Sequence, residues 1–298
     1  MDETDRLYRC IGLPRCGNHP IIFWILHQIE GISYDGEEQY SIASSSRYNW
    51  PNYKLSEIAW SKPSPDGMAV LFNNRGPEDS EHVDGNTKLK KEISCLENIS
   101  KMAGMTKNKI AIFSYEHHQI DAFDKHFVTD VEMVENYLGK IKLHKDILIM
   151  RDAFNAVASR LMMNRANKRP DEDIFDYVDK YKDYAREYLG ETNYLQKKHT
   201  INFNRWVCST EYRKEIADSL GLVYTDKAKN AVSKIGGGSS WNKTDFNKRA
   251  YRMQLDSRWK KFIKDPFYHK IFKDEELIDL SSKIHRVKGA KEILKNAK

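Results

Sequence analysis

This sequence has few cysteines, and none of them is arranged as a metal site or a redox motif. The four cysteines lie far apart along the 298 residues, at Cys10, Cys16, Cys95 and Cys208. Without C-x-x-C pairs or Cys/His spacing, we expect no bound metal and free thiols in a reducing compartment. Cys16 follows Arg15 where a helix is expected to begin, a position that can lower a thiol pKa, so Cys16 is a candidate reactive thiol.

The sequence also lacks a long hydrophobic run. Its longest apolar stretch, residues 21–26, is far too short to cross a bilayer. No segment has the pattern of a signal peptide. Charged residues make up 31% of the chain. We therefore expect a cytoplasmic protein without membrane insertion.

Positive charge is not gathered in any one arm of the chain. The net charge of +6 comes from lysines and arginines spread along the sequence, and the run KLKKE at residues 88–92 is typical of a solvated helix face. This balance suits an anionic cofactor but does not indicate nucleic acid. We expect no nucleic-acid partner.

Apolar residues are frequent enough to build a core, at 40% of the chain with 11% aromatics. Short apolar runs predict buried strands at residues 7–13, 68–72, 110–115, 146–150 and 199–204. Apolar residues at helical spacing predict helices at residues 20–29, 88–102, 131–138, 151–166, 172–189 and 210–220. This order predicts an α/β fold, a three-layer sandwich with a largely parallel central sheet.

We expect a single domain over residues 1–298, with two parts outside this regular pattern. Residues 30–109 are rich in Ser, Asn, Pro and Gly, which predicts long loops with short elements between them. Long loops in an α/β domain are often functional, so this insertion is the candidate wall on the substrate side. Residues 251–298 form a basic tail with a helical pattern.

The stretch 7–29 predicts a strand, a tight loop and a helix, a geometry that suits phosphate or sulfate. Pro20 fits the first helical turn, and the free N–H groups at a helix N-terminus attract anions. Arg15 adds a permanent cation with a planar set of donors.

This loop matches only half of a nucleoside-triphosphate loop. Gly12 and Gly17 have the spacing of G-x-x-x-x-G-K-[ST], but Asn18 and His19 replace the lysine and the hydroxyl. No lysine is available for the β- and γ-phosphates and no hydroxyl for Mg²⁺, which argues against ATP or GTP hydrolysis. Taken alone, two glycines also occur in ordinary turns.

Two further strand ends carry polar groups, and ligands of open α/β sheets bind beyond such ends. Arg151 follows the strand at 146–150, and Ser159 lies two turns into the next helix, so both can face one anion. Glu116, His117 and His118 follow the strand at 110–115. They form either a catalytic group or a plain surface turn.

Two other patterns have a structural and a functional interpretation. A row of tyrosines at helical spacing is interpreted as a packing stripe: Tyr177, Tyr181, Tyr184 and Tyr188. The segment KIGGGSSWN at 234–242 can wrap an anion with its backbone, or serve as a linker.

Four segments together resemble the P-loop sulfotransferase superfamily, whose cosubstrate is 3′-phosphoadenosine 5′-phosphosulfate (PAPS). LPRCGNH (13–19) resembles its 5′-phosphosulfate loop, and the apolar strand with Arg-x₇-Ser in 147–161 resembles its 3′-phosphate motif. INFNRW (201–206) resembles a later strand–helix unit, and GGGSSWN (236–242) the loop that folds over the nucleotide. The GNH variant and the INFNRW segment resemble those of a bacterial or phage-type branch of this superfamily.

The resemblance implies metal-free transfer of a sulfuryl group from PAPS to a hydroxyl or amine, leaving adenosine 3′,5′-bisphosphate. It implies that Arg15 stabilises the bridging oxygen and that Arg151 and Ser159 hold the 3′-phosphate. Further cofactor contacts are implied for Cys16, Gly17, Asn18, His19, Pro20, Gly238, Ser239, Ser240 and Trp241. Because arginine keeps its proton, Arg15 acts only as an electrostatic clamp.

In this family, the catalytic base follows the second strand. Register favours Glu116, with His118 orienting or replacing it and His117 as the third choice, because alternate residues of an extended strand share one side. The acceptor stays open between a small natural product, such as a guanidinium-bearing toxin, and a glycan.

The acidic segment 77–84 has two interpretations, a solvated loop or a steering group for a cationic acceptor. Two other classes also remain, a kinase with a degenerate loop and a non-catalytic nucleotide-binding protein. The sequence leaves the oligomeric state open.

Overall fold

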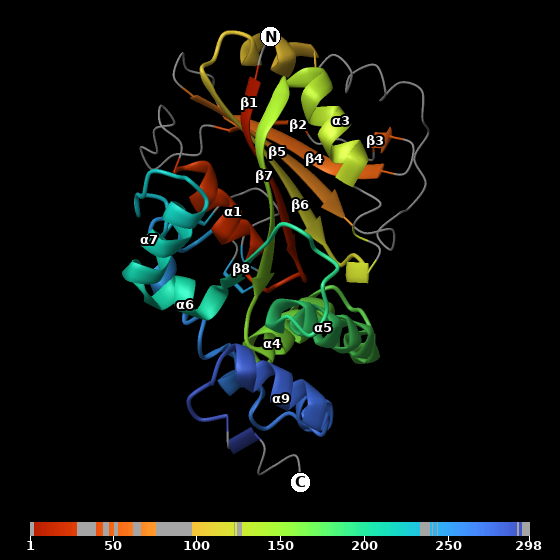
Figure 1. Cartoon of the computed structure of the whole chain (residues 1–298). Coiled ribbons are helices and arrows are strands. Elements are labelled where there is room, and N and C mark those ends of the chain that lie inside the picture. The colour runs from red at the N-terminus through yellow and green to blue at the C-terminus, as the bar shows by residue number, and fades with distance from the viewer. Residues whose placement is uncertain are drawn as a thin grey trace.

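The fold is built on one twisted sheet that crosses the molecule (Figure 1). A computed structural model describes residues 3–28, 40–43, 48–50, 53–61, 67–75, 97–121, 123, 127–232, 239, 241–242, 244–290 and 292–293. Within these residues the sheet has eight strands in the order β2-β4-β5-β6-β1-β7-β8, with β3 paired to β4. The strands are β1 (Glu3–Gly12), β2 (Tyr40–Ala43), β3 (Tyr48–Trp50), β4 (Tyr53–Ser61), β5 (Gly67–Arg75), β6 (Asn108–Glu116), β7 (Lys140–Met150) and β8 (Lys198–Asn202).

The central five strands, β5, β6, β1, β7 and β8, run parallel. Their side chains alternate between two apolar layers: Leu7 and Ile11 of β1 pack into one cluster, and Tyr8 and Cys10 into the other. Strands buried on both faces read as continuous apolar runs, which is why β6 and β7 were visible in the sequence. The predicted α/β class with a parallel central sheet is confirmed.

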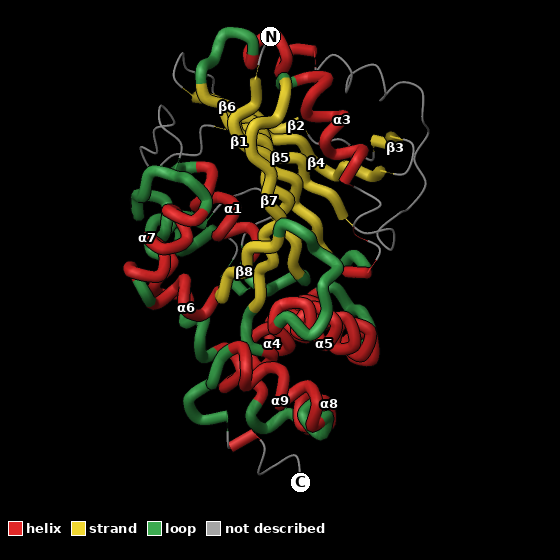
Figure 2. The backbone as a smooth tube through the Cα atoms, viewed as in Figure 1, coloured by secondary structure: helices red, strands yellow, loops and turns green. Residues whose placement is uncertain are grey.

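Helices cover both faces of this sheet (Figure 2). On one face lie α1 (Asn18–Leu26), α6 (Phe203–Cys208) and α7 (Thr210–Ser219). On the other face lie α3 (Phe127–Tyr137), α4 (Ala153–Ala166) and α5 (Ile174–Leu189), with α8 (Pro266–Ile271) and α9 (Glu275–Ile284) packed beyond α4 and α5. The molecule therefore has the three layers that the sequence predicts.

The insertion contains more sheet than its loop-rich composition predicts. The sequence indicated one strand there, β5, whereas β2, β3 and β4 extend the sheet as antiparallel strands beyond it. The pairing of β4 with β5 shifts register between Leu55 and Glu57. Such a shift breaks the alternation of apolar and polar residues, so the nine-residue β4 gave no clear period of two.

Several element boundaries also differ from the prediction. The strand predicted to residue 204 ends at Asn202, whose side chain accepts a bond from Arg205 N and caps α6. Of the helix predicted at 88–102, residues 97–103 are helical and 88–96 lie outside the described residues. The tail forms short helices, including the 3₁₀ segments η5 (Ala250–Met253) and η6 (Arg258–Phe262).

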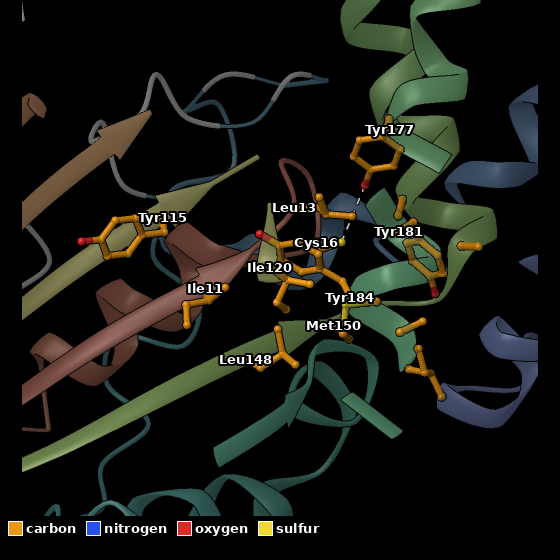
Figure 3. Close-up of a cluster of buried hydrophobic side chains, with 14 of the residues drawn as sticks. Ile11, Leu13, Cys16, Tyr115, Ile120, Leu148, Met150, Tyr177, Tyr181 and Tyr184 are labelled. Atoms are coloured by element: carbon orange, nitrogen blue, oxygen red, sulfur yellow. Dashed lines mark hydrogen bonds between the residues drawn. The ribbon is translucent and has the colours of Figure 1, made fainter. Parts of the chain in front are cut away.

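The tyrosines of α5 lie in the core, as the packing interpretation predicts. The side chains of Tyr177, Tyr181 and Tyr184 are fully buried in the apolar cluster between α5 and the sheet (Figure 3). Tyr188, one turn further, is only partly buried against the same cluster.

Strand register brings the predicted site segments to one edge of the sheet. Gly12 at the end of β1 pairs with Glu116 of β6 on one side and with Ile149 of β7 on the other. From this edge α1 turns onto one face and α4 onto the other. In open α/β sheets a crevice forms where successive connections leave in opposite directions, and ligands bind there. Within the described residues, no helix is long and apolar enough to span a membrane.

Candidate active site

The loop between β1 and α1 is shaped by two glycines that tolerate no side chain. A Cβ on Gly12 would overlap the amide of Asn18. A Cβ on Gly17, whose φ is 101°, would overlap the ring of Phe203. The glycine pair is therefore required by close approach and by backbone conformation, and not only by a turn.

The first turn of α1 presents backbone donors at the strand ends. The first intrahelical bond runs from Ile21 N to Gly17 O, at 3.3 Å, so the N–H groups of Asn18 and His19 precede the helical ladder. Pro20 occupies the first turn, as predicted, where its missing N–H costs no bond. The N–H of Cys16 is already donated to Leu13 O. An anion at this end of α1 would meet N–H groups together with the positive end of the helix dipole.

The backbone of Arg15 is in the left-handed region, with a φ of 76°, and its side chain lines a cavity at the strand ends. Its Nη2 lies 2.7 Å from the sulfur of Met163 on α4. The guanidinium therefore crosses from the β1–α1 loop to the helix that follows β7.

Cys16 is not the reactive thiol that its position suggested. Its side chain is fully buried, lies 3.7 Å from the hydroxyl of Tyr177 and does not line the cavity. Burial raises the pKa of this thiol to about 11, so the thiolate is not formed near neutral pH. The free-thiol interpretation is confirmed for Cys10, Cys16 and Cys208, while Cys95 lies outside the described residues.

Arg151 stands at the end of β7, as predicted, and is almost fully buried. It donates to the carbonyl of Arg15 at 3.3 Å and to the carbonyl of Leu255, and its guanidinium lies over the ring of Phe203. Burial lowers the pKa of Arg151. Its Nε has no hydrogen-bond partner among the described residues. Its Nε also lies 4.0 Å from a carboxylate oxygen of Asp152, so Arg151 is a buried cation with one nearby acid and two carbonyl acceptors. The hydrogen bonds to carbonyls can be exchanged for stronger ones to an anion.

Arg258 is a site residue that the sequence did not reveal. Its Nη1 donates to the hydroxyl of Ser159 at 3.2 Å and its Nη2 to that of Ser239 at 3.4 Å. Arg258 thus links two predicted cofactor segments. Burial, together with repulsion from Arg151 and Arg15, lowers the pKa of Arg258 to about 8.

No motif points to Arg258, because it lies in a basic tail among several exposed lysines and arginines. The weak signal in the sequence is its place next to Trp259, in an amphipathic segment that ends in Phe262. A cation beside buried aromatics is held near the core.

The glycine/serine loop is described only in part. Ser239 lines the cavity, and its hydroxyl also accepts the N–H of Trp241 at 3.2 Å. Trp241 packs edge-on against Phe262 and does not line the cavity. Gly238 and Ser240 lie outside the described residues.

Glu116 is connected to the β1–α1 loop. Its Oε1 accepts a hydrogen bond from the side-chain amide of Asn18 at 3.1 Å, and Nδ1 of His19 lies 3.5 Å from the same oxygen. Asn18 also donates to Leu13 O. Asn18 and His19, which depart from the nucleoside-triphosphate loop, therefore hold the candidate base.

The two histidines after Glu116 are not arranged as the sequence predicts. His117 has a φ of 68°, so the strand alternation that would place Glu116 and His118 on one side does not continue past Glu116. His117 lines the cavity, and its Nε2 lies 3.1 Å from Lys180 Nζ and 3.2 Å from an oxygen of Asp176. His118 is buried edge-on against Tyr115 and does not line the cavity.

Most of the predicted site residues line one cavity of about 610 Å³, whereas Cys16, His118, Ser159 and Trp241 do not. Its described wall carries more cations than acids: Arg15, Arg151, Arg160, Arg169, Lys229 and Arg258, against Glu116 and Asp256. Aromatic and apolar side chains complete it, among them Phe203, Trp206 and Val207 of α6. No cluster of three or more metal-binding side chains was found within the described residues. The cavity can therefore hold a ligand with both anionic and flat apolar parts.

No model of a known protein family matches the sequence, and no curated protein matches it. Among solved structures, the chain is similar to the sulfotransferase domain of the olefin synthase from Synechococcus PCC 7002. The two chains are 13% identical, 96% of each is covered, and the TM-score is 0.43.

Proposed function

We propose that this chain is a sulfotransferase of one domain, which moves a sulfuryl group from PAPS to a hydroxyl or amine of a small-molecule acceptor. The observation that carries the proposal is the group of Arg15, Arg151 and Arg258 at the strand ends. Burial lowers the pKa of Arg258, and the neighbouring charges of Arg151 and Arg15 lower it further. Such an arrangement becomes favourable when an anion lies between the cations.

Two separate anion positions support a nucleotide with phosphate groups at two places. The first turn of α1 with Arg15 would offer one position, and Arg151 with Arg258 the other. Ser159 does not line the cavity and would act by holding the guanidinium of Arg258. A linear triphosphate would need a lysine and a Mg²⁺-binding hydroxyl after the second glycine, where Asn18 and His19 stand. The residues present therefore fit the bisphosphate part of PAPS better than ATP.

The α6 side of the cavity suits a purine base. Phe203 and Trp206 stack at 5.9 Å between ring centroids with an interplanar angle of 16°, and both line the cavity. Aromatic faces bind flat bases by stacking, with little demand on base identity. Phe203 also touches the loop at Gly17 and lies under Arg151, so the base-binding and anion-binding groups adjoin.

PAPS would supply a sulfuryl group already activated for transfer. Arg15 would stabilise the charge that develops on the leaving phosphate, and it cannot act as a proton donor. Glu116 would accept the acceptor's proton, oriented by the amide of Asn18. His19 would bias this carboxylate electrostatically when its ring is protonated. In this scheme His19 takes the orienting role that the sequence gave to His118.

Ligand-dependent melting tests the proposal. Adenosine 3′,5′-bisphosphate should raise the melting temperature more than ATP or Mg²⁺-ATP does, because a ligand that binds the native state stabilises it. Labelled PAPS with a panel of small-molecule and glycan acceptors should then give a sulfated product. Preferential stabilisation by Mg²⁺-ATP would indicate a kinase instead. Bisphosphate binding without transfer to any acceptor would indicate a nucleotide-binding protein that is not an enzyme.

A further inference from the structure

One face of α5 carries three tyrosines whose hydroxyl groups the apolar core does not require. Tyr177, Tyr181 and Tyr184 follow one another at spacings of four and three, so they form a row on the helix. Their side chains are fully buried between α5 and the strand ends (Figure 3). Phenylalanine would fill the same space, and a buried hydroxyl without a partner is costly. The partners of these hydroxyls therefore show what the row does.

Each hydroxyl donates to a backbone carbonyl in a different loop of the candidate site. The three bonds run from Tyr177 Oη to Pro14 O at 3.0 Å, from Tyr181 Oη to Arg151 O at 2.8 Å, and from Tyr184 Oη to His118 O at 2.9 Å. The acceptors belong to the segments that follow β1, β7 and β6. One helix thus contacts the loop that bears Arg15, the junction that bears Arg151 and the turn that follows Glu116.

Two of these loops contain backbone that needs support. Arg15 and His117 have φ values of 76° and 68°. Residues other than glycine adopt this left-handed backbone conformation at a cost in free energy. Tyr177 binds the carbonyl just before Arg15, and Tyr184 the carbonyl just after His117. Tyr177 therefore holds the peptide group that precedes Arg15, and Tyr184 holds the peptide group one residue beyond His117.

The three hydroxyls stay protonated near neutral pH, so they remain able to donate these bonds. Burial raises the pKa of Tyr177, Tyr181 and Tyr184 well above its ordinary value. None of the three lines the cavity, so they do not meet a bound ligand. Their contribution passes through the carbonyls that they bind.

We propose that Tyr177, Tyr181 and Tyr184 are positioning residues that fix three functional groups relative to one another. Tyr177 sets the loop that presents Arg15, Tyr181 sets the backbone that presents Arg151, and Tyr184 sets the turn beside Glu116. This inference rests on the proposed sulfotransfer function. It adds that α5, which supplies no group to the reaction, is the common support of the three.

Single Tyr→Phe variants should separate these roles, because each removes one oxygen and keeps the ring. A lost hydrogen bond corresponds to a change of about 5- to 10-fold. Tyr177→Phe should weaken both adenosine 3′,5′-bisphosphate and adenosine 5′-phosphosulfate by this factor. Tyr181→Phe should weaken only the bisphosphate, since the 5′-phosphosulfate lacks the 3′ group. Tyr184→Phe should lower kcat by this factor and leave both nucleotide affinities unchanged.

Two other tyrosines in the chain provide matched controls. Tyr8 and Tyr268 are fully buried, and each donates to a backbone carbonyl, of Leu220 at 2.6 Å and of Phe154 at 2.7 Å. Neither carbonyl belongs to a residue that lines the cavity. Tyr8→Phe and Tyr268→Phe should lower the melting temperature as much as the α5 variants do, with nucleotide affinity and kcat unchanged.

The proposal is tested by which of the two nucleotide affinities and kcat changes in each variant, and not by the loss of stability. Nucleotide affinities and kcat that change alike in all five variants, or that change only with melting temperature, would overturn it. A wild-type chain that binds the bisphosphate while the three α5 variants behave like the controls would overturn this inference alone. A wild-type chain that binds no bisphosphate would overturn the proposed function, and this inference with it.

Discussion

The two halves of the cavity hold their charged groups in different ways. On the side that we propose binds the nucleotide, the side chains of Arg151 and Arg258 are 1% and 9% exposed. On the side where we propose that the acceptor binds, the side chains of Glu116 and His19 are 19% and 27% exposed. Enclosed cations suit one fixed ligand, since their desolvation is offset only by a matching anion. A partly exposed carboxylate such as Glu116 leaves room for acceptors of varied shape, and the acceptor is the ligand that the sequence does not identify.

The largest effect should come from the acceptor half. Glu116→Gln keeps the shape of the side chain and removes its basicity, so turnover should fall on the order of 10²–10⁴-fold. Bisphosphate affinity should not change, because the amide oxygen of glutamine can still accept the hydrogen bond from Asn18, and Glu116 is not proposed to contact the nucleotide. Initial rates with labelled PAPS and calorimetry with the bisphosphate measure the two quantities. Turnover close to wild type would transfer the role of base to His117 or His118.

The next largest effect should come from Arg151 in the nucleotide half. Arg151→Ala removes a charge-assisted contact, which should weaken bisphosphate binding by about 2 kcal/mol, or roughly 30-fold. Affinity for adenosine 5′-phosphosulfate should stay nearly constant. Calorimetric titration of both nucleotides makes the comparison. An equal loss for both would refute the assignment of Arg151 to the 3′-phosphate.

Substitution of Arg258 should have a smaller effect on nucleotide binding and an opposite effect on stability. Burial lowers the pKa of Arg258, and the charges of Arg151 and Arg15 lower it further, so its charge is held at a cost in the ligand-free protein. Arg258→Met should therefore raise the melting temperature of the ligand-free protein by a few degrees. The same variant should bind the bisphosphate about 10-fold more weakly.

Lys260, an exposed cation two residues away, provides the matched control for Arg258. Lys260→Met should change neither the melting temperature nor the nucleotide affinity appreciably. A lower melting temperature in Arg258→Met would show that this arginine stabilises the fold instead of opposing it.

The smallest effect should come from the acidic segment 77–84, which lies outside the described residues. We infer that Glu78, Asp79, Glu81 and Asp84 draw a cationic acceptor toward a cavity whose described wall is mainly cationic. Neutralising all four should raise the acceptor KM a few-fold at low salt and remove its salt dependence. PAPS affinity should stay constant. Higher turnover on an anionic glycan than on any small cation would reject this inference.

The sequence predicted those parts of the site whose signals are local. The run from 146 to 161 combines an apolar strand, the capping residue Asp152 and an apolar helix face, so these residues alone were enough to place Arg151 at a strand end. The pair of Gly12 and Gly17 indicated a loop, and the close approaches of Asn18 and Phe203 show why both are glycine.

Long-range contacts could not be predicted in the same way. The α5 tyrosines were recognised as a packing row, but their hydroxyl partners are backbone carbonyls 30 to 163 residues away, which carry no side-chain pattern. Arg258 joins Ser159 across 99 residues without a motif. The turn at His117 was not predicted, because no residue pattern indicates a positive φ in a residue other than glycine.

The contact between Arg151 and the carbonyl of Leu255 has a consequence for turnover. Because the guanidinium of Arg151 already has an acceptor, it is not left desolvated and without a hydrogen bond in the ligand-free site. If Arg151 binds the 3′-phosphate as we propose, an incoming phosphate would exchange with this carbonyl, and the affinity would reflect the difference between a charged and a neutral acceptor. We infer that the Leu255 carbonyl would then compete with bound product for Arg151 and limit how tightly the product is retained.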